Sequence, residues 1–155
     1  MDSESKMEET QSKRWLGANA AIFDGQGKIL LVKHTYGQRN WELPGGVAEA
    51  NESIVETALR EAREETGLHV FAEYTTGIYY EPELDLLCFV FLCRPKDGTL
   101  DNVHPDNNEI GECRFWSPQA LPRPISDFTI RRVSDAAVGV RLPLPVVIPK
   151  RQWLY

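Results

Sequence analysis

The sequence predicts an α+β domain, a layered α/β/α sandwich in which a mixed β-sheet lies between helices. Three observations indicate this fold class. Segments rich in branched and aromatic residues predict five strands, of which Leu86–Arg94 is apolar almost throughout, as in a strand at the centre of a sheet. Two other segments, Ser53–Thr66 and Ser126–Gly139, have helical spacing. The length of 155 residues suits one domain with one core.

The first elements are two expected strands joined by a tight turn. Trp15–Asp24 has the small and branched apolar residues of a buried strand, and Lys28–His34 repeats that character after the turn Gly25–Gly27. This pattern predicts a hairpin. After a polar loop, Trp41–Gly46 is a short extended piece that ends at a proline and two glycines.

The clearest element is the helix Ser53–Thr66. Ser53 is a favourable N-cap residue, and Glu56 three positions later completes a capping box. Gly67 follows as the residue whose left-handed backbone ends the helix. Apolar side chains at helical spacing form one buried stripe: Ile54, Val55, Ala58, Leu59 and Ala62.

The second half of the chain continues the alternation. His69–Tyr80 is rich in strand-forming residues, and Leu86–Arg94 follows as the expected central strand. The long polar loop Pro95–Asn108 is of a length that is often functional or mobile. Glu109–Ser117 alternates as a strand does. The basic pair within the helix Ser126–Gly139 is interpreted as an ordinary helix face.

The two ends differ from the middle of the chain. Residues 1–13 are polar and lack the apolar core of a secretory signal, so a disordered leader is expected. Residues 14–140 form the expected domain. Residues 141–155 are proline-rich, and we expect this tail to pack on the domain or on a partner. Because no stretch is long and apolar enough to cross a membrane, a cytoplasmic location is expected.

Composition narrows the classes of function. The net charge of −6 and pI of about 5.1 argue against a protein that binds nucleic acid or membrane surfaces through basic patches. Small phosphorylated ligands remain possible, because a bound cation could supply the positive charge. The cysteines, Cys88, Cys93 and Cys113, are odd in number and without CxxC spacing, so free thiols are expected. The scattered histidines argue against zinc.

Three acidic residues crowd the end of the first helix. At 100° per residue, Glu61, Glu64 and Glu65 occupy an arc of roughly 100° that borders the apolar stripe. Mutual repulsion and the helix dipole both make this arrangement unfavourable. A divalent cation with oxygen ligands, Mg²⁺ or Mn²⁺, would remove the conflict. The alternative is a solvated, charged helix face.

The spacing around these acids resembles a known family motif. Gly46, Glu52 after five residues, and Arg60–Leu68 after seven more fill every specified position of the Nudix box, G-x5-E-x7-R-E-U-x-E-E-x-G-U. Ala62 is smaller than the aliphatic residue usual at its position. The resemblance covers roughly Trp15–Ala137. It implies a mixed sheet between helices and a metal-dependent hydrolase that cleaves a nucleoside diphosphate linked to another moiety.

The resemblance also implies roles for single residues. The three helix glutamates would be metal ligands, and the carbonyl of Gly45 could join them. Arg60 would pair with a glutamate of the box, most plausibly Glu52, and orient the helix. A further acid from a later loop often acts as ligand or general base. Glu109 is the expected candidate, with Glu112 or a box glutamate as alternatives.

The substrate is less well defined by the sequence. Phosphates could be contacted by Arg39 and His34. Aromatic side chains could stack on a base, although packing in the core or at its rim is the favoured interpretation for them: Tyr36, Trp41, Tyr79 and Tyr80. The expected substrate is a small nucleotide, either ADP-ribose or another nucleotide sugar, or a nucleoside triphosphate. A nucleotide-sensing module without catalysis and an RNA 5′-end hydrolase are the alternatives. The resemblance makes a homodimer possible.

Overall fold

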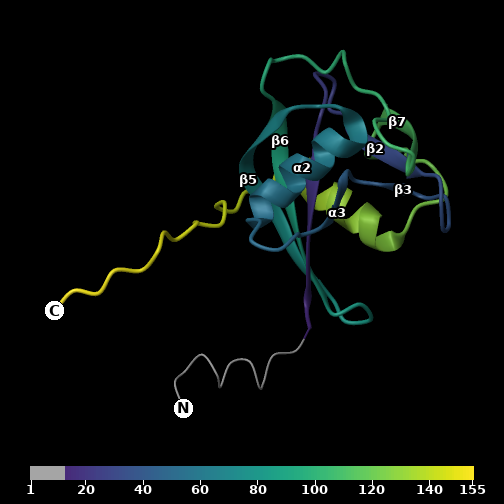
Figure 1. Ribbon diagram of the computed structural model, residues 1–155. Helices are drawn as coiled ribbons and strands as arrows, with labels where there is room; N and C mark the ends of the chain where they lie inside the picture. The colour runs from purple at the N-terminus through teal and green to yellow at the C-terminus, as the bar shows by residue number, and fades with distance from the viewer. Residues whose placement is uncertain (1–12) are drawn as a thin grey trace.

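The computed structural model describes residues 13–155. The expected leader therefore lies almost entirely outside the described residues. Within them, seven strands and two helices follow one another along the chain (Figure 1). No helix in this part of the chain has the length and apolar character needed to span a bilayer. All three cysteines are free thiols, as expected.

The larger sheet has four strands and mixed direction. Its order is β4 (Gly45–Val47), β1 (Trp15–Ala21), β6 (Leu86–Pro95) and β5 (Val70–Glu81). β1 and β6 run parallel, and the other two pairs are antiparallel. The expectation that the apolar strand β6 lies inside the sheet is confirmed, because β1 and β5 flank it.

The smaller sheet has three antiparallel strands. Its order is β3 (Trp41–Glu42), β2 (Ile29–His34) and β7 (Ile110–Trp116). The predicted hairpin is therefore wrong: the turn is present, but the first two strands do not pair with each other along their length. Only the bridge between Phe23 and Ile29 joins them, because β1 takes β6 as its partner and β2 takes β7.

The two helices cover opposite faces of the larger sheet (Figure 1). α2 (Ile54–Thr66) packs with Ala18 and Ala20 of β1 in one buried cluster. α3 (Asp127–Ala137) packs with Ala21 of the same strand in a second cluster. Since alternate residues of a strand face opposite sides of the sheet, the helices lie on different sides. The expected α+β sandwich is confirmed, with its strands divided between two sheets.

Local signals fix the bounds of α2. Ser53 and Glu56 form the predicted capping box, and Gly67 ends α2 with a φ of 73°. The carbonyl groups of the last turn are then satisfied by the loop before β7. His104 donates its N–H to the carbonyl of Thr66 at 3.1 Å, and Asp106 donates to that of Glu65 at 3.2 Å. This long loop is thus tied to the C-terminal end of α2.

Candidate active site

The end of α2 meets the short strand β4 through a buried carboxylate. Glu65 is only 5% exposed, and its Oε1 accepts a hydrogen bond of 3.0 Å from the backbone N–H of Gly45. Its Oε2 is buried and has no hydrogen-bond partner among residues 13–155. A buried carboxylate with one free oxygen is unfavourable unless a cation or a proton accompanies it.

The paired glycines let the carboxylates approach the backbone of β4. A Cβ atom on Gly46 would lie 2.5 Å from Oε1 of Glu61, and one on Gly45 would lie 2.3 Å from the carbonyl oxygen of Ala18. Both distances are too short for any side chain. Glycine is therefore required at Gly45, where the neighbour is backbone, whereas at Gly46 the Glu61 carboxylate would have to leave its place.

Arg60 gathers the acids on the outer side of the helix. Its Nε donates to Glu52 at 2.6 Å, so the expected pairing of these two residues is present. Its Nη1 also lies 3.0 Å from one oxygen of Glu61 and 3.0 Å from one of Glu64. The hydrogen bond from Arg60 lowers the pKa of Glu52 to about 2. Arg60 and Glu52 thus brace the helix as a permanent ion pair.

Glu65 has the opposite electrostatic character. Burial raises the pKa of its carboxyl group to about 9, although the N–H of Gly45 acts in the other direction. The neighbouring carboxylate of Glu61 adds to the rise. Ionising both Glu65 and Glu61 is therefore energetically unfavourable unless a cation lies between or beside them.

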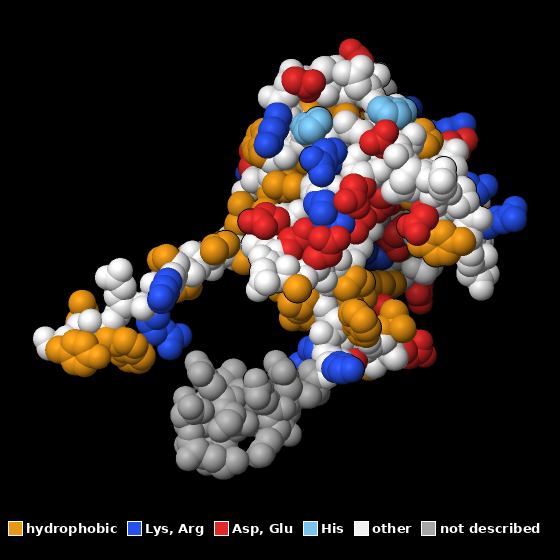
Figure 2. All heavy atoms as spheres, viewed as in Figure 1, with side chains coloured by type: hydrophobic (Ala, Val, Ile, Leu, Met, Phe, Trp, Pro, Cys, Tyr) orange, Lys and Arg blue, Asp and Glu red, His pale blue; other side chains and the backbone are white. Residues whose placement is uncertain are grey.

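A cavity of about 450 Å³ opens beside these carboxylates. Of the residues singled out in the sequence, seven line it: Gly45, Gly46, Glu61, Glu65, Glu109, His34 and Tyr36. The stacked rings of His34 and Tyr36 form one wall, with centroids 5.0 Å apart. On the outer surface, acidic side chains gather around basic ones over this region (Figure 2). Glu52, Arg60 and Glu64 are not part of the lining.

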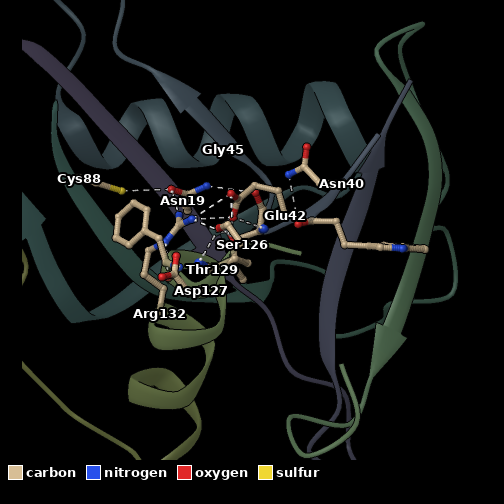
Figure 3. A network of polar contacts seen from close by, with 12 residues as sticks. Asn19, Asn40, Glu42, Gly45, Cys88, Ser126, Asp127, Thr129 and Arg132 are labelled. Atoms are coloured by element: carbon tan, nitrogen blue, oxygen red, sulfur yellow. Dashed lines mark hydrogen bonds and ion pairs between the residues drawn. The ribbon is translucent and has the colours of Figure 1, made fainter. Parts of the chain in front are cut away.

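The inner end of the cavity is a polar network that joins α3 to both sheets (Figure 3). Arg132 is 3% exposed, and its Nη2 donates to Oε1 and Oε2 of Glu42 at 2.8 and 2.9 Å. Its Nη1 donates to Oδ1 of Asn19 at 2.9 Å. Thr129 donates its hydroxyl to Glu42 at 2.9 Å, and the thiol of Cys88 lies 3.2 Å from Asn19. These residues present fixed donors and acceptors beside the cavity.

Glu109 also lines the cavity, and hydrogen bonds of its backbone fix its position. Asn107 accepts a hydrogen bond of 2.9 Å from the N–H of Glu109, and it donates 3.2 Å to the carbonyl of Glu64 on α2. The carbonyl of Glu109 accepts from the N–H of Thr35 at 2.9 Å. Glu112, the alternative candidate, instead pairs with Arg114 at 3.1 Å and does not line the cavity.

A family model described as the NUDIX domain matches residues 13–136. The chain belongs to the NUDIX family. It is thus a Nudix hydrolase, of a family that acts on nucleotide diphosphate-linked substrates. The box predicted from the sequence is the stretch that carries β4, Glu52 and the acids of α2.

Two curated relatives and one solved structure illustrate the likeness. The chain is 31% identical over 125 residues to a putative 8-oxo-dGTP diphosphatase of Bacillus subtilis, with 81% of each protein covered. It is 29% identical over 135 residues to an 8-oxo-dGDP phosphatase of Homo sapiens, covering 84% of this chain and 42% of that protein. The chain thus spans less than half the length of the human relative. An ADP-ribose pyrophosphatase structure from Streptococcus suis is 29% identical, with a TM-score of 0.64, over 81% of this chain and 92% of that one.

The remaining substrate candidates lie outside the lining of the cavity in this Nudix domain. Trp41 is 4% exposed and packs edge-on against Trp116 in the core. Arg39 sits in the exposed turn after β2, with a φ of 52°. The hydroxyl groups of Tyr79 and Tyr80 donate to Asp135 and Asp85, each at 2.7 Å, at other places on β5.

Sequence reasoning missed the inner end of the Nudix cavity. The basic pair on α3 was interpreted as a helix face, which is wrong for Arg132, whereas Arg131 has a side chain that is 71% exposed. Glu42 and Asn19 carried no signal of their own, because their partner lies about a hundred residues away in the chain. The short stretch "WELPGG" does not indicate whether the side chain of Glu42 faces the interior or the solvent.

The residues present fit a divalent cation. The free oxygen of Glu65 and the carboxylate of Glu61 are hard oxygen ligands, and they lie beside the backbone of Gly45 and Gly46. Within residues 13–155 no three acidic, histidine or cysteine side chains already converge as a metal cluster. Glu61 already borders the cavity, whereas Glu64 lies outside its lining and pairs with Arg60, so the side chain of Glu64 would have to turn inward to join a metal ion.

Proposed function

We propose that the protein hydrolyses a phosphoanhydride bond of a small free nucleotide with the help of Mg²⁺ or Mn²⁺. One observation carries the proposal. The buried carboxylate of Glu65 lies beside Glu61 and the glycine backbone of β4 and lines a cavity. Polar groups held in fixed positions line another part of the same cavity. A nucleotide needs a charged region of the site for its phosphates and a polar region that recognises the base or sugar.

The charges of the cavity support a role for a cation. Five glutamates line it: Glu42, Glu61, Glu65, Glu81 and Glu109. Arg132 is the one arginine or lysine among the lining residues, and its guanidinium is committed to Glu42. A pyrophosphate group would therefore meet mainly negative charge. When bound, a divalent cation neutralises phosphate oxygens and lowers the pKa of a bound water.

The residues of the chain would bind the cation, accept a proton and bind the substrate. Glu61, Glu64 and Glu65 hold the cation, and Arg60 with Glu52 keeps their helix in place. Glu109 lines the same cavity and accepts the proton of the attacking water. Asn19, Glu42 and Arg132 bind the non-phosphate half through hydrogen bonds. His34 and Tyr36 offer a stacked aromatic wall for a planar ring.

The favoured substrate is a purine nucleoside di- or triphosphate with an oxidised base. Two relatives bear names for activity on 8-oxo-dGDP and 8-oxo-dGTP. The polar inner end offers both donors and acceptors, which would discriminate a modified base from an ordinary one. ADP-ribose is the second candidate, because a solved structure of similar fold and sequence carries the name of an ADP-ribose pyrophosphatase.

A substrate panel tests this proposal. Purified protein with Mg²⁺ is supplied with 8-oxo-dGDP, 8-oxo-dGTP, dGTP, ADP-ribose and 5′-triphosphorylated RNA, and the products are separated by chromatography. Preferred release of 8-oxo-dGMP supports the first candidate, and preferred release of AMP from ADP-ribose supports the second. Binding without turnover of any nucleotide would contradict hydrolysis and favour a sensing module. Turnover only of 5′-triphosphorylated RNA would contradict the small-nucleotide assignment.

A further inference from the structure

The C-terminal tail leaves the domain with its apolar residues in water. Leu142 forms an isolated antiparallel bridge with Thr75, and Pro143 accepts a hydrogen bond of 2.8 Å from the Thr75 hydroxyl. From Pro145 onward every residue is exposed. The tail projects away from the body and carries apolar and basic side chains (Figures 1 and 2). Its largely exposed apolar residues are Val146, Val147, Ile148, Trp153, Leu154 and Tyr155.

The domain also has an apolar hollow that is open to solvent. It has a volume of about 250 Å³ and is lined by Trp15, Val47, Leu84 and Leu86, at the end of the sheet where β5 turns into β6. Trp15 and Leu84 are more than half exposed. An apolar concavity next to exposed apolar side chains is typical of an interaction site.

The charges around the two features are complementary. Glu81 and Glu83 closely precede Leu84 in the sequence, Asp85 after it pairs with Arg14 at 3.0 Å, and the chain as a whole carries a net charge of −6. The tail places Lys150 and Arg151 directly before its aromatic end. A basic, aromatic segment that enters an apolar hollow with an acidic rim would gain from both apolar burial and opposite charge.

The direction of the tail favours the hollow of a second copy. Because the bridge to Thr75 is antiparallel, the residues after Leu142 run toward the Val70 end of β5. Leu144 accordingly packs on the cluster beneath α2. The chain's own hollow lies beyond the other end of β5, so the tail would have to reverse direction to reach it. Thirteen residues follow Leu142 and can extend roughly 43 Å, enough to cross to a neighbouring molecule.

We propose that the protein forms a dimer in which each copy inserts its C-terminal tail, with Trp153 as anchor, into the Trp15–Val47–Leu84–Leu86 hollow of the other. A reciprocal exchange uses the same contact twice and closes the assembly at two copies. Val47, Leu84 and Leu86 also line the nucleotide cavity, so the inserted tail borders the proposed active site of the partner.

The test uses one variant on each side of the contact. Trp153→Asp removes the anchor, and Leu84→Asp places a charge in the hollow, and both side chains are exposed in the single chain. Val138→Asp, at a side chain that is 74% exposed outside both features, is the matched control. Mass is measured by light scattering after size-exclusion chromatography, and the dissociation constant by sedimentation over a series of protein concentrations.

The native protein and Val138→Asp are expected to be dimers. Each of the other two variants should weaken dimerisation about tenfold or more. An equal mixture of Trp153→Asp and Leu84→Asp should dimerise more tightly than either variant alone, because one of the two contacts then joins an intact tail to an intact hollow. A native monomer, even one in which the fluorescence of Trp153 shows a buried indole, would overturn the proposal. Dimers unaffected by both variants, or a mixture that dimerises no more tightly than either variant alone, would overturn it as well.

Discussion

The backbone N–H of Gly45 holds Glu65 by a hydrogen bond of 3.0 Å, while the other carboxylate oxygen of Glu65 is buried without a partner among the described residues. This relationship links the strand and the helix of the Nudix box. Burial makes the ionised form of Glu65 unfavourable in the folded protein and raises the pKa of its carboxyl group to about 9. The cost has measurable consequences for stability.

Glu65→Gln is expected to stabilise the protein when metal ions are removed. The folded-state pKa lies above that of a glutamate in an unfolded chain, so the contribution of protonated Glu65 to stability is complete below about pH 4.5 and is lost as the pH rises through about 9. Glutamine has no charge to lose. In buffer with EDTA, the melting temperatures should agree near about pH 5, and the variant should melt a few degrees higher near about pH 8.

Glu64→Gln is the control for this effect, because the Glu64 side chain is 44% exposed and paired with Arg60. The melting temperature of Glu64→Gln relative to that of the native protein should not increase as the pH rises. A Glu65→Gln variant that loses stability relative to the native protein as the pH rises would contradict the assigned cost.

Gly46→Ala is expected to lower activity with little loss of stability. The added Cβ would lie 2.5 Å from Oε1 of Glu61, and the flexible carboxylate can move aside. We expect kcat/KM to fall about tenfold to a hundredfold, since a metal ligand would be displaced. Urea unfolding should change by less than about 1 kcal/mol. Gly25→Ala, at a position with open space around it, should leave both quantities unchanged. Full activity in Gly46→Ala would show that Glu61 need not lie at this place.

Arg132→Met is expected to destabilise the fold by about 3–5 kcal/mol, because it leaves the carboxylate of Glu42 without its buried partner. The double variant Arg132→Met/Glu42→Gln should recover a large part of this loss, since no uncompensated charge remains. Arg131→Met removes the exposed neighbour and should cost less than about 0.5 kcal/mol. Equal losses in Arg131→Met and Arg132→Met, measured by urea unfolding, would contradict the buried ion pair.

Glu109→Gln is expected to reduce kcat by about a hundredfold to ten-thousandfold, if Glu109 accepts the proton of the attacking water. Glu112→Gln should leave kcat nearly unchanged, because its side chain pairs with Arg114 away from the cavity. Asn107→Ala should lower kcat about tenfold with KM preserved, since Asn107 fixes the backbone of Glu109 relative to α2. Steady-state kinetics with the preferred substrate distinguish these variants. A larger loss in Glu112→Gln than in Glu109→Gln would reverse the assignment.

Local signals made the catalytic helix predictable from the sequence. The capping box of Ser53 and Glu56 and the left-handed residue Gly67 each act within a few residues. The predicted helix therefore begins and ends where α2 does, with Ser53 as its cap. The pairing of Arg60 with Glu52 was also predictable, because the box fixes the spacing between them.

Long-range pairing made the rest unpredictable. The first two strands share a turn, yet β1 pairs with β4 and β6 whereas β2 pairs with β3 and β7, so the two strands enter different sheets. Arg131 and Arg132 are neighbours on one helix, and only the position of Glu42 in the folded molecule decides which of them is buried. For Trp41 the sequence favoured packing over stacking on a base without naming a partner, and its place against Trp116 arises from the pairing of β3 with β2.

The central claim is that the acids of α2 form the metal centre of a nucleotide hydrolase. The most direct measurement is the Mg²⁺-dependent turnover of the preferred nucleotide by Glu64→Gln/Glu65→Gln, with circular dichroism to show that the variant is folded. We expect turnover to fall by several orders of magnitude at every Mg²⁺ concentration, while the fold is retained. Full Mg²⁺-dependent turnover by this folded variant would contradict the claim.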